Sequence, residues 1–436
     1  MIKLCFHLNS FAVLTFLLQI LFISTTNDKK LFTYPLTINF HLNPPIAKSI
    51  SVSIHDYLHQ IIPTFEFCLS EPKQCFPIAL DNTIYQTWIP SNELSQYFNN
   101  TYTKTINEIE THSDGSTALL DNAFVSGYFA KTKVSPYKND LNGNEPLFLI
   151  AYMKEGTIHR KIPFYSGKMG LLKFSPHLED NTNYLYFLKA NGLIDKQVFA
   201  IEIKDFKQGN IIIGDDTEKY NSNNVGYCEM PKNHYQLSWT CKLNHIIYGN
   251  ITLEITSEKG EFVMIETLRQ TIQAPIDSGE YILQQMVKKS NDMCSIIKEG
   301  RIMYLTCDEK YNIEKIDNIL LKSGDFELKL FASDFFEFSD EQKKYISKLV
   351  VNMNEKEVWN VGVVGMNNKM IIFDKEDDKI GIIELKRKKI KKINLFWICF
   401  GLGFIVIVII IFISLFIRRN RLRKSAAKID FTLMKK

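Results

Sequence analysis

The sequence has no Cys-x-x-Cys spacing and no repeat of 20 to 50 residues. The first absence argues against a zinc site built from cysteine pairs, and the second argues against a solenoid. A strong charge is also absent, because the formal net charge is +4 and its excess lies near the C-terminus. We therefore expect no nucleic-acid-binding surface across the body of the protein.

Long uncharged runs occur at the two ends of the chain. Residues 1–26 have the pattern of a secretory signal peptide, with Lys3 in front of an apolar core at 11–23 and small polar residues after it. The alternative is a signal anchor that is retained in the mature protein.

A second uncharged run, residues 393–417, is long enough to cross the hydrocarbon core of a bilayer as one helix. Basic segments flank it at 386–392 and 418–424, so the positive-inside rule does not settle its orientation. A cleaved signal followed by this transmembrane helix would place residues 27–392 in the lumen or outside. The tail at 418–436 would be cytoplasmic, and the pattern leaves open the secretory pathway, the vacuole and the plasma membrane.

Cysteine usage fits an oxidising compartment. Apart from Cys5 and Cys399 in the apolar runs, the cysteines form three close pairs: Cys68–Cys75, Cys228–Cys241 and Cys294–Cys307. Six cysteines allow 15 connectivities, of which these three disulfides are the simplest. Asn99 and Asn250 begin Asn-x-Thr sequons and are candidate glycosylation sites in such a compartment.

Short β-rich runs separated by Gly, Asn, Asp and Pro dominate the region between the apolar ends. They predict a mainly β fold with short helices, and the clearest runs are 36–40, 76–80, 199–203, 211–213, 251–255 and 369–373. Residues 339–351 have the apolar spacing of a helix.

One local pattern recurs far apart in the chain. I-A-L-D-N-T at 78–83 and A-P-I-D-S-G at 274–279 each place an Asp at the end of an apolar strand. Alone, either motif is typical of an ordinary turn. Their separation suits one copy in each of two lobes, predicted at 27–190 and 191–385.

The segments around the two motifs are collinear with those of one family, the pepsin-like aspartic proteases, which they resemble over about residues 31–385. The similar segments are P-K-Q-C-F-P-I-A-L-D at 72–81 with W-I-P at 88–90, H-S-D-G-S at 112–116, S-G-K-M-G-L-L at 166–172, G-N-I-I-I-G at 209–214, A-P-I-D-S-G-E at 274–280 and W-N-V-G-V-V-G at 359–365. The resemblance implies a bilobal, mainly β fold.

The resemblance also implies a chemistry. Asp81 and Asp277 would be two carboxylates close enough to share a proton and activate a water molecule that attacks a peptide bond. Such a site needs no metal and no cofactor, and its substrates are peptides or proteins.

The active-site loops depart from the family pattern of Asp-Thr/Ser-Gly followed by a hydroxyl residue. The first loop has Asn82, Thr83 and Ile84 after its aspartate; the second retains Ser278 and Gly279 but continues with Glu280. Thr83 adds a β-branched side chain at a tight turn, and Ile84 cannot donate a hydrogen bond. Glu280 would add a third negative charge.

The region that resembles the substrate-covering flap departs as well. The best alignment places its tip at His112, Ser113, Asp114 and Gly115, with the histidine at the position of a family tyrosine. The histidine would either hydrogen-bond near the substrate or have no role.

Three functions remain compatible with these residues. The first is a membrane-anchored aspartic endopeptidase, impaired by its first loop. The second is an inactive pseudoprotease or receptor that binds extended peptides in the same place. The third is an unrelated β-rich adhesion ectodomain, in which case the resemblance carries no meaning.

Overall fold

The computed structural model describes residues 32–42, 59–70, 73–102, 109–120, 123–135, 147–157, 165–173, 182–215, 225–231, 238–255, 260–386, 409, 411–417 and 419. The chain forms two compact units, residues 1–386 and 387–436. The predicted signal peptide lies outside the described residues. So does most of the predicted membrane span, and among the described residues no helix is both long and apolar enough to cross a membrane.

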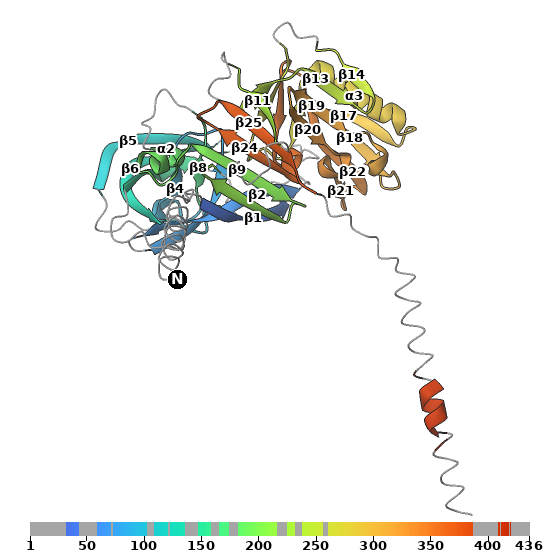
Figure 1. Ribbon diagram of the computed structural model, residues 1–436, viewed down its shortest axis with the longest axis horizontal. Helices are drawn as coiled ribbons and strands as arrows, with labels where there is room; N and C mark the ends of the chain where they lie inside the picture. Colours follow the sequence, from blue (N-terminus) through green and yellow to red (C-terminus); the bar gives the residue numbers. More distant parts are fainter. Residues whose placement is uncertain are drawn as a thin grey trace, which may run out of the picture. The chain divides into compact units, whose positions relative to one another are not determined.

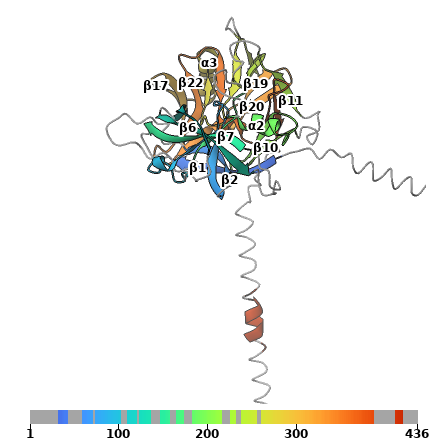
Figure 2. The same cartoon turned by 90° about the vertical axis from the view of Figure 1, so that its left-hand side faces the viewer.

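The first unit is built mainly from strands (Figures 1 and 2). Its largest sheet has the order β11-β25-β24-β9-β10-β1-β2-β3-β8-β4-β7-β6-β5. The bounds of its strands are β1 (Phe32–Leu42), β2 (His59–Ser70), β3 (Lys73–Asp81), β4 (Trp88–Pro90), β5 (Ile109–Leu120), β6 (Ala123–Ser135), β7 (Leu147–Thr157), β8 (Lys168–Gly170), β9 (Val198–Lys204), β10 (Gln208–Ile213), β11 (Gly226–Glu229), β24 (Lys369–Asp374) and β25 (Lys379–Glu384).

Two further sheets come from the C-terminal half. The eight-stranded sheet has the order β12-β15-β23-β16-β22-β18-β17, with β21 paired to β22, and the four-stranded sheet has the order β14-β13-β19-β20. Their bounds are β12 (Thr240–Lys242), β13 (His245–Tyr248), β14 (Ile251–Leu253), β15 (Phe262–Ile265), β16 (Ile272–Ala274), β17 (Cys294–Glu299), β18 (Ile302–Asp308), β19 (Ile319–Ser323), β20 (Phe326–Leu330), β21 (Phe336–Ser339), β22 (Lys344–Asn352) and β23 (Val358–Val361).

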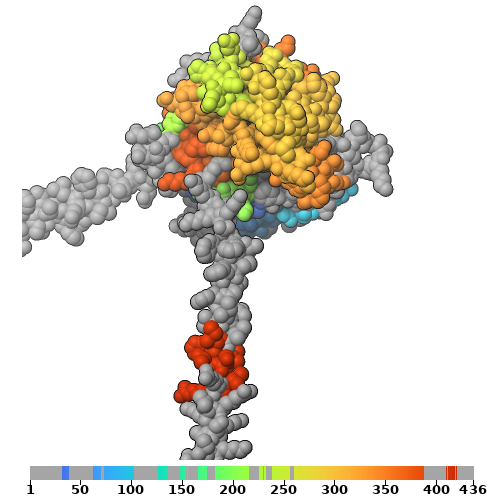
Figure 3. All heavy atoms as spheres, turned by 90° about the vertical axis from the view of Figure 1, so that its right-hand side faces the viewer, coloured from blue at the N-terminus to red at the C-terminus, as the bar shows by residue number. Residues whose placement is uncertain are grey.

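Helices are short, as predicted. The described α-helices of the first unit are α2 (Tyr184–Ala190), α3 (Ile276–Lys289) and α4 (Ala332–Phe335), and the 3-10 helices are η2 (Asn92–Leu94), η5 (Ile313–Lys315) and η6 (Val363–Met366). The yellow and orange segments, which include α3, β17 and β18, form a broad outer face of the C-terminal half (Figure 3).

The predicted helix over residues 339–351 is wrong, because this segment forms the end of β21, a turn and most of β22. β22 lies between β16 and β18 and is buried over 346–351. A strand covered on both faces loses the alternating pattern that identifies a strand, and a continuous apolar run also fits a helix. The predicted strands at 36–40, 76–80, 199–203, 211–213 and 369–373 are confirmed, and that at 251–255 is β14, which ends at 253.

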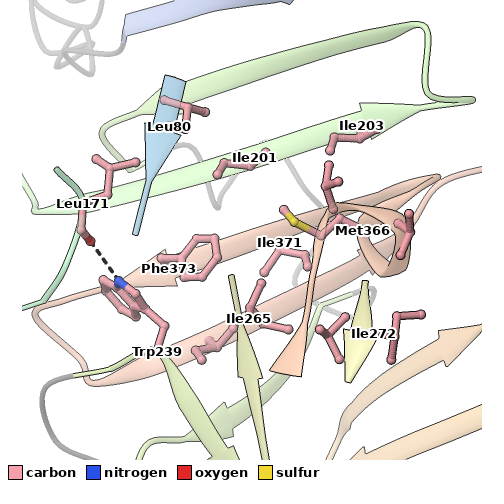
Figure 4. Close-up of a cluster of buried hydrophobic side chains, with 14 of the residues drawn as sticks. Leu80, Leu171, Ile201, Ile203, Trp239, Ile265, Ile272, Met366, Ile371 and Phe373 are labelled. Atoms are coloured by element: carbon pink, nitrogen blue, oxygen red, sulfur yellow. Dashed lines mark hydrogen bonds between the residues drawn. The ribbon is translucent and has the colours of Figure 1, made fainter. Parts of the chain in front are cut away.

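A continuous core joins the two halves of the first unit. Leu80 of β3 and Ile265 of β15 belong to the same buried cluster, together with Ile201, Ile371 and Phe373 of the large sheet (Figure 4). The Trp239 indole N–H donates to the Leu171 carbonyl at 2.8 Å in this cluster. The loops that follow β3 and β15 are therefore supported by one core.

Candidate functional site

Asp81 ends β3 and is only 3% exposed, in agreement with its apolar sequence context. Its Oδ1 accepts two hydrogen bonds from Thr83, one from the backbone N–H at 2.9 Å and one from the hydroxyl at 2.5 Å. The threonine that we expected to disturb the loop therefore stabilises the carboxylate.

Lys168 supplies the other partner of this carboxylate. Its Nζ lies 3.0 Å from Asp81 Oδ2, and the two side chains are 6% and 4% exposed. The position follows from the sheet, because β8 runs parallel to β3 and pairs Lys168 with Ala79 and Gly170 with Asp81. The lysine lies within the S-G-K-M-G-L-L segment at 166–172, in which our sequence interpretation did not single it out.

Asn82 and Thr267 join the loops that follow β3 and β15. The Asn82 amide donates to the Ile265 carbonyl at 2.6 Å, and its Oδ1 accepts the Thr267 N–H at 3.0 Å. The Thr267 hydroxyl donates to the Leu80 carbonyl at 2.6 Å and accepts the Asn82 N–H at 3.2 Å. These four hydrogen bonds form a lattice between the two loops, made by an amide on one side and by a hydroxyl on the other.

The two loops are equivalent by their pairing. β15 runs parallel to β23 as β3 runs parallel to β8. The carbonyl of Ile84 accepts the N–H of Leu172 at 2.9 Å, and that of Arg269 accepts the N–H of Val363 at 2.8 Å. Counting back three residues from each of these carbonyls makes Glu266 the equivalent of Asp81 in the second loop.

Glu266 forms an ion pair with Arg269. It is 9% exposed, and the Arg269 guanidinium donates to both of its carboxylate oxygens, at 2.5 Å from Nε and 3.3 Å from Nη2. Nη1 of the same arginine donates to Gln273 Oε1 at 2.8 Å. The second carboxylate of the site is therefore also neutralised, by a residue of its own loop.

Asp277 does not lie where the sequence comparison placed it. It is exposed in the first turn of α3, a helix that lies on the outer side of the C-terminal half (Figure 1). In the described part of the chain it has no hydrogen bond or ion pair with Asp81; it lines a cavity of about 300 Å³ beside β14. The reason is local: β16 ends at Ala274, and the helix that follows Pro275 leaves no strand-ending turn for Asp-Ser-Gly.

The other residues of the second predicted loop have structural contacts on α3. A Cβ on Gly279 would lie 2.7 Å from a Val351 methyl group, so glycine permits close helix packing here. Ser278 donates to the buried Glu261 carboxylate at 2.9 Å, and Glu280 contacts Gln284 and Lys298 near the surface. Burial raises the pKa of Glu261, against the opposing hydrogen bonds from Trp359 and Ser278.

The predicted flap residues lie within β5 rather than at a hairpin tip. β5 pairs with β6, and the last pair is Leu120 with Ala123, so the connection consists of residues 121–122, which lie outside the described residues. His112 pairs with Phe129, and the register shifts on either side of that pair. The stretch 112–115 is therefore an irregular part of a strand.

Three disulfides join the predicted cysteine pairs, Cys68–Cys75, Cys228–Cys241 and Cys294–Cys307. Glu66 approaches the first pair, but cysteines in a disulfide offer no thiolate to a metal. Asn99 and Asn250 are exposed, and their glycosylation remains a prediction.

Sequence reasoning missed Glu266 because it searched for two aspartates. A usable signal was present: in V-M-I-E-T at 263–267, an apolar strand is followed directly by a carboxylate and a threonine. A helix begins only later, after Pro275. The motif A-P-I-D-S-G is closer to the family's Asp-Thr/Ser-Gly pattern, but its Asp, Ser and Gly lie in that helix.

Two comparisons with known proteins complete these observations. A family model described as eukaryotic aspartyl protease matches residues 66–385, which is more than half of the chain. A search of the curated proteins found no match.

Proposed function

Because the chain belongs to the eukaryotic aspartyl protease family, we propose that it is a pseudoprotease, which binds extended peptide segments at the Asp81–Glu266 site without hydrolysing them. The family implies peptide or protein substrates. Of the functions compatible with the sequence, this one agrees best with the charges at the site.

The observation that carries the proposal is the buried Lys168–Asp81 pair. Hydrolysis by this family's chemistry needs a carboxylate that takes a proton from water while a protonated carboxyl group polarises the peptide carbonyl. An ammonium group 3.0 Å from Asp81 Oδ2 occupies the oxygen that would share the proton.

The Glu266–Arg269 pair supports the same conclusion. The Arg269 guanidinium donates to both oxygens of Glu266, so neither oxygen is left without a cationic donor. A cation is thus hydrogen-bonded to each acid, at the oxygens where a shared proton would lie.

The neighbouring positions favour a binding role for apolar segments. Ile84 lies in the loop after Asp81, and Leu268 lies in the loop after Glu266. Both are partly buried and pack against a cluster that contains Trp88 and Met153. Ile84 has no hydroxyl to orient a water, whereas apolar side chains of a bound peptide would pack against this cluster.

We further propose that residues 393–417 anchor the protein in a membrane, with residues 27–392 on the luminal or extracellular side. The support is the uncharged run in the sequence, together with the exposed apolar side chains of the helical residues 411–417. Protease protection of the folded domain in sealed microsomes tests this topology; digestion without detergent would contradict it.

The activity is tested with the full-length chain in detergent, incubated with a diverse peptide library from about pH 3 to pH 6. We expect peptides to be bound, and no peptide to be cleaved. Cleavage that is lost in Asp81→Asn and Glu266→Gln but kept in Asp277→Asn would establish an active endopeptidase and refute the proposal. The Asp277 variant is the matched control, because that carboxylate is exposed on α3.

A further inference from the structure

Lys168 and Asp81 are held together by the backbone as well as by their charges. They lie on adjacent, hydrogen-bonded parallel strands, with Nζ and Oδ2 3.0 Å apart. Intramolecular reactions between well-oriented groups reach effective concentrations of about 10⁵–10⁸ M.

The hydrogen bonding of the lysine is incomplete for an ammonium group. An ammonium has three N–H donors, and within the described residues Asp81 Oδ2 is the one acceptor that Nζ contacts. Both side chains are buried, so two donors and two charges are withdrawn from water. A neutral amide would carry one N–H in the same place.

The other carboxylate oxygen is already polarised. Oδ1 of Asp81 accepts the Thr83 N–H at 2.9 Å and the Thr83 hydroxyl at 2.5 Å. Two donors on one oxygen stabilise negative charge that develops there when a nucleophile adds to the carbon.

From these three features we propose that Lys168 and Asp81 condense to an intramolecular isopeptide bond. A proton passes from Nζ to Oδ2, and the neutral amine attacks Cγ to form a tetrahedral intermediate whose negative oxygen is Oδ1. Nζ then loses a second proton to Oδ2, the Cγ–Oδ2 bond breaks, and one water molecule leaves. The product is an amide that links β3 to β8, and no oxidant or cofactor takes part.

This modification is independent of peptide binding. It would turn the Asp81 carboxylate into an amide and so make the loss of hydrolysis permanent. An unlinked Lys168–Asp81 ion pair would still leave the pseudoprotease proposal standing, whereas peptide cleavage would refute that proposal whatever the linkage.

The test is peptide mapping of the full-length folded chain, treated to remove N-glycans, reduced, alkylated and digested with trypsin. The bond blocks cleavage after Lys168, so we expect one branched peptide joining residues 74–104 to residues 162–173, lighter than their sum by one water. Fragmentation must place the branch between Asp81 and Lys168.

Two variants serve as controls. Lys168→Arg retains the positive charge but cannot form this amide, and Asp81→Ala removes the acceptor, so both should give separate peptides. If the wild-type chain has its three disulfides and still yields free peptides 162–168 and 169–173 with no branched product after prolonged storage at neutral pH, the proposal is wrong.

Discussion

The two halves of the site neutralise equivalent carboxylates in different ways. Asp81 is paired with a lysine from the neighbouring strand β8, and both groups are buried. Glu266 is paired with an arginine three residues further along its own loop, and that arginine is 31% exposed. Unrelated residues thus produce the same charge pattern, whereas drift at one position would have altered one half only.

The halves also differ in the hydrogen bonds that each loop makes to the other. On one side the lattice uses the two ends of the Asn82 amide, and on the other it uses the single hydroxyl and N–H of Thr267. The amide reaches two backbone groups of the opposite loop.

The largest expected effect comes from removing the buried cation. Lys168→Met leaves Asp81 as an unpaired buried charge, and we expect the free energy of unfolding to fall by about 3–5 kcal/mol. Urea denaturation measures this loss. The double variant Lys168→Met with Asp81→Asn should recover most of it, and a single-variant loss below about 1 kcal/mol would show that the pair is not buried as described.

The next effect concerns the lattice. Asn82→Ala leaves the Ile265 carbonyl and the Thr267 N–H without these partners, and at about 1–2 kcal/mol for each group we expect a loss of about 2–4 kcal/mol. Thermal and urea denaturation check this. Thr267→Ala is the mirror variant: it leaves the Leu80 carbonyl and the Asn82 N–H without the hydroxyl, so we expect a similar loss, and an unchanged stability in either variant would contradict this account of the lattice.

Removing the second cation should matter less. Arg269→Met breaks a partly exposed pair, and we expect a loss of about 1 kcal/mol that shrinks further in 1 M salt. A loss as large as that of Lys168→Met, measured in the same urea series, would mean that the two halves are energetically alike.

The smallest effect is a pH dependence in the C-terminal half. Burial raises the pKa of Glu261 above its ordinary value of 4.5, so its contribution to stability is full below pH 4.5 and is lost as the pH rises through the folded-state pKa. Glu261→Gln retains an acceptor for Trp359 and Ser278 but cannot titrate. We expect the variant to flatten the fall of the melting temperature with rising pH, and an unchanged profile would argue against this assignment.

Much of the fold was predictable because its signals are local. The strands around 76–80 and 199–203, the three disulfides and the mainly β class follow from short apolar runs and from closely spaced cysteines. The error over 339–351 arose where a strand is buried on both faces, because there the period of the sequence no longer distinguishes strand from helix.

The site was harder to predict because its parts are far apart in the chain. Apolar context alone marked Asp81 as a costly buried carboxylate, and the family resemblance implied a second acid. The identity of that acid depended on which strand ends beside Asn82, a contact across 185 residues. Strand pairing likewise put a lysine beside Asp81, because parallel neighbours are selected by the sheet and not by sequence distance. The sequence by itself determined the class of fold and the first carboxylate, whereas the tertiary structure decided its partner and its counter-charge.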